Sequence, residues 1–310
     1  MAESQVAPWP DISLDGNANA RDTLHMWTQI VGKIRTRQMP WINHSWHCTL
    51  YTTPRGLTTL NMPHGDRSFQ IEFDFQEPAL LITADDGATA GFALESMSVA
   101  DFFQRTMEQL GELDLPVRIH GAPNEVTEPI PFAEDDQHNA YDEDWAKNLH
   151  RALVSTDRVM NKFRAGFVGK CSPVHFFWGS FDMAVTRFSG RPAPPHPGGF
   201  PHMPDWITRE AYSHEVSSCG FWPSDGKNPA FFYAYAYPVP EKFAEQPALP
   251  EAASYSQEMG EFVLPYAAVQ ESATPEDDLL AFFESTYEAA ANCADWDRTA
   301  LEWDGPQRKG

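Results

Sequence analysis

The densest group of side chains that could do chemistry lies between residues 175 and 215. Histidines and carboxylates brought together by a strand and an irregular loop can hold a metal ion through three protein ligands and leave a coordination position open. We expect a divalent zinc or iron ion at this place, with ligands drawn from His175, His196, His214 and Glu215. With Asp182 orienting an imidazole, the predicted catalytic residues are His175, Asp182, His214 and Glu215.

The spacing of these residues does not match a known metal motif. His214-Glu215 is followed by Val216-Ser217-Ser218, so the sequence lacks the helical H-E-x-x-H of zinc hydrolases at this point. The alternative is that His196 and His202 are exposed loop residues and that His175 is a core histidine bonded to the backbone.

Other residues of the second half are candidates for holding a substrate. Arg187 and Arg191 could bind a carboxylate or phosphate through two parallel hydrogen bonds. Arg187, however, has a counterpart in Arg55, and two structural ion pairs would explain that match equally well. In an extended strand His44 and His47 point to opposite faces, so one of them is expected to reach the pocket. The predicted substrate-binding residues are Arg187, Arg191, Trp178, Tyr233, Tyr235, His44 and His47.

Two similar units are expected to position these residues. Each has a helix that runs into Val-Gly-Lys, a strand with tryptophan and arginine nine residues apart, and a closing helix of the form F-F-x-x-T-x-E. The matched positions are Val31-Gly32-Lys33 and Val168-Gly169-Lys170, Trp46 and Trp178, Arg55 and Arg187, Phe102 and Phe282. We therefore expect an α+β fold, internally duplicated as a helix, antiparallel strands and a helix with pseudo-twofold symmetry.

The composition along the chain sets the expected boundaries of the two repeats. The first repeat is predicted over residues 1–120, an acidic proline-rich linker over 121–141 and the second repeat over 142–302, together forming one compact unit, with a polar tail over 303–310. A proline- and histidine-rich insertion at about 190–229 has no counterpart in the first repeat. Helices are predicted over 22–34 and 142–168, and strands over 44–53, 69–75, 174–188, 231–237 and 261–269.

The predicted strands 69–75 and 231–237 differ in one respect. In 69–75 apolar residues alternate with Gln70, Glu72 and Asp74, which is typical of a sheet with one face in water. In 231–237 one face carries aromatic residues and the other is mostly alanine. The aromatic face consists of Phe231, Tyr233, Tyr235 and Tyr237. This pattern predicts a covered sheet or a pocket wall whose phenols need partners.

Charge and composition exclude several classes of protein. The formal net charge is −22, with only 22 lysines and arginines in 310 residues, which argues against nucleic-acid or anionic-membrane partners. We find neither a run of apolar residues long enough to span a bilayer nor a secretory signal. The four scattered cysteines favour free thiols in a reducing compartment, so we expect a cytoplasmic protein.

Several strings resemble an uncharacterised microbial family that is known only as a domain of unknown function, and the resemblance extends over nearly the whole chain. It rests on residues 24–33, 43–47, 175–182, 194–199 and 209–215, among them His175-Phe176-Phe177-Trp178 and Pro194-Pro195-His196-Pro197-Gly198-Gly199. The resemblance implies no activity, cofactor or catalytic residue.

The expected function is that of a metal-dependent enzyme acting on a small, anionic or amino-acid-like molecule. Its site is predicted between the second-half sheet and the insertion. Two alternatives remain open at this stage: a non-catalytic small-molecule binding protein or sensor with an aromatic pocket, and a metal-free enzyme using histidine and carboxylate as base and acid. The sequence does not settle the oligomeric state.

Overall fold

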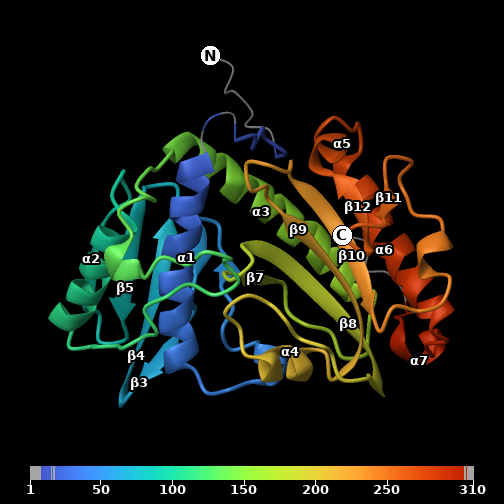
Figure 1. Cartoon of the computed structure of the whole chain (residues 1–310), viewed down its shortest axis with the longest axis horizontal. Helices are drawn as coiled ribbons and strands as arrows, with labels where there is room; N and C mark the ends of the chain where they lie inside the picture. Colours follow the sequence, from blue (N-terminus) through green and yellow to red (C-terminus); the bar gives the residue numbers. More distant parts are fainter. Residues whose placement is uncertain (1–7, 15, 17, 304, 306–310) are drawn as a thin grey trace.

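The chain forms two antiparallel six-stranded sheets with helices around them (Figure 1). The computed structural model describes residues 8–14, 16, 18–303 and 305, so most of the predicted polar tail lies outside the described residues. The α+β class is confirmed. Among the described residues, no helix is both long and apolar enough to cross a membrane. The four cysteines are free thiols.

The first sheet has the order β1-β2-β4-β5-β6, with β3 paired to β4. Its strands are β1 (Tyr51–Thr52), β2 (Gly56–Thr58), β3 (Met62–His64), β4 (Arg67–Asp74), β5 (Ala79–Ala84) and β6 (Thr89–Ala93). The alternation predicted for 69–75 is confirmed in β4 up to Phe73: Phe69, Ile71 and Phe73 are fully buried, and Gln70 and Glu72 are half-buried. Asp74 is 1% exposed and departs from the predicted face in water. The strand predicted over 44–53 forms only at its end, as β1. Its start is a 3₁₀ helix, η1 (Asn43–Ser45), in which His44 has a left-handed φ of 59°.

The second sheet has the order β11-β12-β10-β9-β8-β7. Its strands are β7 (His175–Phe177), β8 (Asp182–Pro192), β9 (His214–Trp222), β10 (Phe231–Tyr237), β11 (Ser254–Ser256) and β12 (Glu261–Pro265). The strand predicted over 231–237 is confirmed. The one predicted over 174–188 is two strands joined by a tight turn at Phe181, whose φ is 59°. The one predicted over 261–269 ends at Pro265, where the helix α5 (Tyr266–Gln270) begins.

The segment 190–229, predicted as an insertion, contains a strand of the second sheet. Its prolines and glycines up to Pro204 form the irregular part, followed by the short helix α4 (Asp205–Ala211). The remainder supplies β9, which pairs with both β8 and β10 in the middle of the sheet. The prolines and glycines are concentrated before residue 205, so residues 214–222 can form a regular strand.

The helices lie around the two sheets. They are α1 (Ala18–Gln38), α2 (Val99–Glu112), α3 (Glu143–Ala165), α4, α5, α6 (Pro275–Cys293) and α7 (Arg298–Leu301), with 3₁₀ turns η2 (Phe132–Glu134) and η3 (Phe243–Glu245). Ser98 caps α2 by accepting a hydrogen bond from the backbone of Asp101 at 3.0 Å. The helix predicted over 22–34 begins four residues earlier, at Ala18. In Figure 1, α2 flanks the first sheet and α6 the second.

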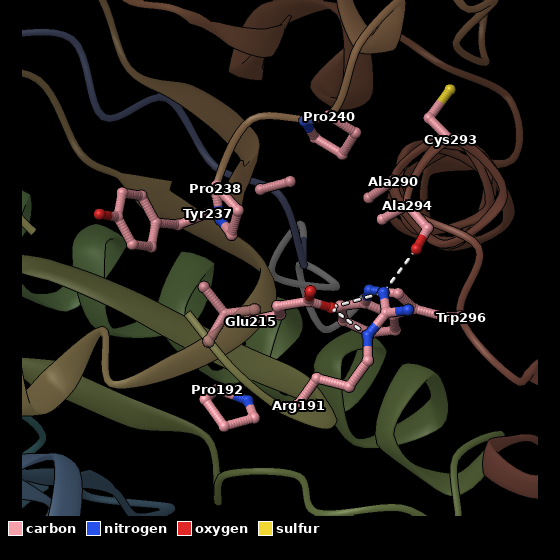
Figure 2. Close-up of a pocket in the computed structure, with 12 residues that line it drawn as sticks. Arg191, Pro192, Glu215, Tyr237, Pro238, Pro240, Ala290, Cys293, Ala294 and Trp296 are labelled. Atoms are coloured by element: carbon pink, nitrogen blue, oxygen red, sulfur yellow. Dashed lines mark hydrogen bonds and ion pairs between the residues drawn. The ribbon is translucent and has the colours of Figure 1, made fainter. Parts of the chain in front are cut away.

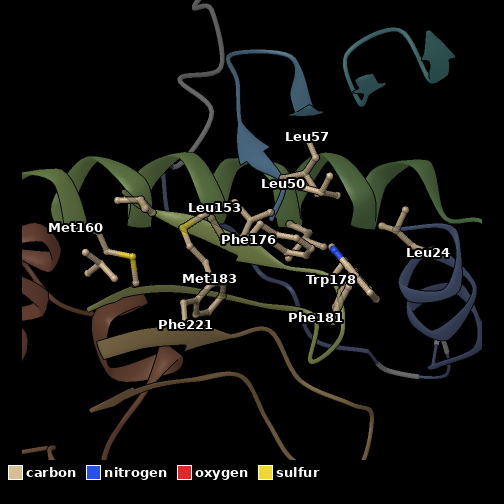
Figure 3. Packing of buried hydrophobic residues seen from close by; sticks show 14 of the residues in the cluster. Leu24, Leu50, Leu57, Leu153, Met160, Phe176, Trp178, Phe181, Met183 and Phe221 are labelled. Atoms are coloured by element: carbon tan, nitrogen blue, oxygen red, sulfur yellow. The ribbon is translucent and has the colours of Figure 1, made fainter. Parts of the chain in front are cut away.

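The two sheets meet at a single antiparallel bridge between Leu50 and Phe176. The backbone of each residue donates to the carbonyl of the other, both at 2.9 Å. Figure 3 shows Leu50 and Leu57 of the first half in the same cluster as Phe176 of the second and Leu153 of α3. One hydrophobic core therefore contains residues of both halves.

The pairs that suggested an internal duplication lie in different surroundings. Trp46 is half-buried after η1, whereas Trp178 is buried after β7 and donates a 2.7 Å hydrogen bond to the carbonyl of Cys48. Arg55 is exposed in the turn between β1 and β2, whereas Arg187 is 1% exposed in the middle of β8. The duplication and its pseudo-twofold symmetry are therefore not confirmed.

Candidate functional site

A cavity of about 1370 Å³ covers one face of the second sheet. The pleat of the strands directs alternate side chains into this cavity. The sheet contributes Asp182, Ala184, Thr186 and Phe188 from β8, Val216, Ser218 and Trp222 from β9, Phe231, Tyr233, Tyr235 and Tyr237 from β10, and Glu261 and Val263 from β12. The tyrosine row of β10 is thus a wall of this cavity.

Segments from both halves of the chain close the cavity opposite the sheet. The part of 190–229 that precedes β9 supplies His196, Phe200, Met203 and residues of α4. This cover is held to η1 by Glu210, whose carboxylate oxygens accept hydrogen bonds from the backbone of His44 at 2.8 and 2.9 Å. It is also held to the predicted linker, where the backbone of Glu125 donates to the carbonyl of Pro201 at 2.9 Å.

Asp182 is the most buried acid of the cavity. It accepts hydrogen bonds from the hydroxyl groups of Ser180 and Tyr233. Tyr233 reaches it from β10 across the intervening strand, because Gly220 of β9 has no side chain there. A Cβ at Gly220 would lie 2.1 Å from Cζ of Tyr233. Burial raises the pKa of Asp182, and the two hydroxyl donors partly offset this rise.

Of the other carboxylates that line the cavity, Glu125 and Glu261 interact electrostatically with Asp182. Burial raises the pKa of Glu125 to about 7, and repulsion from Asp182 adds to the rise. Burial and the same repulsion raise the pKa of Glu261 to about 7. In the described part of the chain, no lysine, arginine or histidine forms an ion pair with any of these three carboxylates. Glu125 and Glu261 can therefore exchange a proton near neutral pH.

A chain of aromatic rings connects Asp182 to the cover. Tyr233 stacks on Tyr235 with ring centroids 6.1 Å apart. The hydroxyl of Tyr235 is 2.8 Å from that of Tyr212 in the cover, and the ring of Tyr212 stacks on His196 at 4.7 Å. Burial raises the pKa values of all three tyrosines. At neutral pH these phenols therefore act as neutral hydrogen-bonding groups.

His44 and His47 both line the cavity on the side of η1. Nε2 of His44 lies 2.5 Å from Nζ of Lys170, and its Nδ1 lies 3.0 Å from the carbonyl of Ala211. Burial and then Lys170 lower the pKa of His44, so the imidazole is neutral beside the ammonium group. Nδ1 of His47 accepts a hydrogen bond from the backbone of Ile42 at 3.3 Å. Both histidines thus have structural partners.

The four predicted metal ligands do not come together. His196 lies in the cover against Tyr212, and His214 begins β9 beside Ser213. His175 is buried on β7, where Trp46 and Tyr51 pack against its ring and burial lowers its pKa to about 3. Within the residues that the structure describes, no group of three or more histidine, cysteine, aspartate and glutamate side chains is arranged to hold a metal ion.

Glu215 lies away from the cavity, in a separate pocket of about 410 Å³ next to the end of α6 (Figure 2). There it forms a 2.7 Å ion pair with Arg191, which also donates to the carbonyl oxygens of Ala294 and Asp295. Successive residues of a strand point to opposite faces, so Glu215 projects from the other face of β9 than Val216. The expected joint role of His214 and Glu215 therefore has no support in this geometry.

Arg187 also points away from the cavity. It forms an ion pair with Glu284 of α6, with nitrogen–oxygen distances of 3.0 and 3.1 Å. Its guanidinium lies 3.4 Å from the ring centroid of Phe163 and 4.3 Å from that of Tyr287. Arg187 is accordingly a structural residue between the sheet and its helices, which is the alternative that the sequence left open.

Among the cavity residues that the sequence-based selection missed are Glu125, Glu261 and Tyr212. Glu125 falls in the predicted acidic, proline-rich linker. Glu261 begins a predicted strand. Tyr212 lies within the resembling string 209–215, so that string was a usable signal for it. Trp178, Tyr233 and Tyr235, predicted as pocket walls, do line the cavity.

Fold and cavity together define an α+β protein with an aromatic, carboxylate-bearing chamber on one of two antiparallel sheets. The chain belongs to a family of unknown function, DUF5996, whose model matches residues 9–303. Comparison with curated proteins and with solved structures gave no significant match.

Proposed function

We propose that this protein binds a small organic molecule in the cavity on the second sheet. The observation that carries the proposal is the cavity itself, with a volume of about 1370 Å³, aromatic walls and a few converging polar groups. Ligand sites in proteins have this composition: apolar surface supplies affinity, and a small number of polar groups fix orientation. The second sheet forms one wall of the cavity, and the segments that cover it are distant from the sheet in sequence.

A second candidate function is general acid–base catalysis at the same site. It is favoured by the raised pKa values of Glu125 and Glu261, both about 7. A carboxyl group with a pKa near the working pH both gives up and accepts protons efficiently. Asp182, held by Tyr233 and Ser180, lies close enough to couple electrostatically to both. A metal-dependent reaction would need ligands other than the four first selected.

A neutral apolar dye tests the binding proposal directly. Nile red should gain fluorescence on titration into the purified protein, as it does on entering an apolar cavity. Ala184 lines the cavity from β8 and is 5% exposed, so Ala184→Phe should fill part of the space and weaken dye binding. Ala93 ends β6 on the first sheet and is exposed, so Ala93→Phe is a matched control.

The expected result is a loss of dye affinity of about tenfold in Ala184→Phe, or about 1.4 kcal/mol, and no change in Ala93→Phe. Circular dichroism and thermal unfolding must show that both variants fold. Equal dye binding by the wild type and folded Ala184→Phe would contradict the proposal.

A further inference from the structure

We infer that the ligand of this cavity is an organic amine: a protonated nitrogen attached to an apolar body. This inference rests on the proposed binding function and specifies the ligand class. Its basis is that Glu125, Asp182 and Glu261 line the cavity together with aromatic side chains and exposed apolar side chains.

Within the described residues, no positively charged side chain forms an ion pair with Glu125, Asp182 or Glu261. Asp182 is 7% exposed, and its hydrogen-bond donors are the neutral hydroxyl groups of Ser180 and Tyr233. For the carboxylate of Glu125, the described residues provide neither a hydrogen-bond donor nor an ion pair, although its oxygen closely approaches Gly179. Buried charges in proteins are normally paired. A ligand cation would supply the missing partner.

The walls next to these carboxylates are suited to a cation. Trp178, Tyr233 and Tyr235 line the cavity, and the negative face of an aromatic ring attracts an ammonium group. One such contact already exists at the edge of the chamber. Nζ of Lys33 lies 5.4 Å from the ring centroid of Trp178 and donates to the amide oxygen of Asn124.

The mouth of the cavity is suited to an apolar body. Large hydrophobic side chains are seldom grouped on a protein surface without a function. Five that are exposed line this chamber: Trp41, Phe200, Trp206, Val239 and Met259. A molecule whose amine lies near Asp182 would extend its apolar part past Tyr235 toward these residues.

Basic residues also line the cavity, and they set a limit on the ligand. Lys33, Arg37 and Arg118 belong to α1 and to the segment before Asn124. None of them forms an ion pair with the three carboxylates in the described residues. An anionic head group would be attracted to this side of the chamber and repelled from the side of Asp182. A cationic group of the ligand is therefore expected on the side of Asp182, and an anionic group on the side of the basic residues.

Three small probes of nearly equal shape test the inference: 2-phenylethylammonium, 2-phenylethanol and 3-phenylpropionate. Their phenyl groups are the same, and their head groups are cationic, neutral and anionic. Isothermal titration calorimetry at pH 7.5 should show that the ammonium probe binds at least about tenfold more tightly than the other two.

Two variants connect that preference to the carboxylates. Asp182→Asn and Glu125→Gln keep side-chain shape while removing negative charge, and each should weaken binding of the ammonium probe by about tenfold. Binding of 2-phenylethanol should remain unchanged within about threefold. Glu251→Gln is the matched control, because Glu251 is exposed and does not line the cavity. If Asp182→Asn does not fold, Glu125→Gln still tests whether removing a negative charge weakens binding of the ammonium probe.

The outcomes separate this inference from the proposed function. If 2-phenylethanol or 3-phenylpropionate binds as tightly as the ammonium probe, or the ammonium probe fails to bind while Nile red still enters the cavity, the ligand is not an amine and the binding function stands. If Nile red also binds the wild type and Ala184→Phe alike, the proposed function fails as well.

Discussion

The hydroxyl of Tyr233 on β10 donates a hydrogen bond to Asp182 on β8, across the whole width of β9. This bond links three strands of the second sheet and sets the position of the most buried acid in the cavity. It depends on Gly220 of β9, which pairs with Tyr233 and leaves room for the tyrosine ring. The first two predictions concern this arrangement.

Tyr233→Phe is expected to lower the free energy of unfolding by about 1.5–3 kcal/mol, the usual contribution of a hydrogen bond to a charged group. Urea denaturation monitored by circular dichroism measures the change. Tyr237→Phe is the control, since its hydroxyl donates to the carbonyl of Pro194 in an exposed position at 3.0 Å. A loss no larger in Tyr233→Phe than in Tyr237→Phe would show that the bond to Asp182 contributes little.

Gly220→Ala is expected to destabilise the protein by about 1–3 kcal/mol, because the added methyl group collides with the ring of Tyr233 and overpacks the sheet. Gly111→Ala provides a control of opposite sign. Gly111 lies within α2, where a Cβ would meet nothing within 4 Å, so alanine should stabilise that helix. Thermal unfolding of the two variants measures both effects, and a neutral Gly220→Ala would contradict the account.

Glu125→Gln is expected to change how stability depends on pH. The pKa of Glu125 rises from 4.5 to about 7 on folding, first through burial and then through Asp182. The folded protein thus holds the proton more tightly than the unfolded chain, and stability falls as pH rises from about 4.5 to 7. Removing the carboxylate should leave stability unchanged near pH 4.5 and increase it by about 1–3 kcal/mol at pH 8.

The titratable groups that interact electrostatically with Glu125 from neighbouring elements are Asp182, Cys48 and Tyr212. Chemical denaturation of wild type and Glu125→Gln at several pH values isolates its contribution from theirs. The same stability difference at pH 4.5 and at pH 8 would contradict a raised pKa at this residue.

Arg187→Met is expected to lower the free energy of unfolding by at least about 2 kcal/mol, because it leaves Glu284 without its partner and removes the contacts with Phe163 and Tyr287. Arg191→Met should cost less than about 1 kcal/mol, since its ion pair with Glu215 is exposed on the arginine side. Nile red affinity should be unchanged in both folded variants. A loss of dye affinity in Arg187→Met would contradict the structural role of Arg187.

The sequence predicted the parts of the fold that local patterns determine. Alternation identified β4 and β10, and the face of β10 that carries Tyr233 and Tyr235 does line a cavity. The pattern could not predict the turn at His44, because the neighbouring apolar and aromatic residues suit a strand equally well. Nor could it reveal β9, which follows a run of prolines.

The site was harder to predict than the fold, because its acids come from distant segments. Asp182 was predicted as a site residue, but Glu125 and Glu261 look ordinary in sequence, and tertiary packing brings all three to one chamber. The histidines indicated a metal site by their number between residues 175 and 215. In the structure, His175 and His196 pack against aromatic rings and do not meet each other. The residue types indicated the sheet that carries the cavity, but they suggested a metal site in place of a group of carboxylates.

A crystal structure of the protein with 2-phenylethylammonium tests the central claim most directly. The account predicts the phenyl ring within the cavity and the nitrogen within hydrogen-bonding distance of Asp182 or Glu125. A probe bound elsewhere on the protein, or a cavity that stays empty at saturating probe concentration, would contradict it.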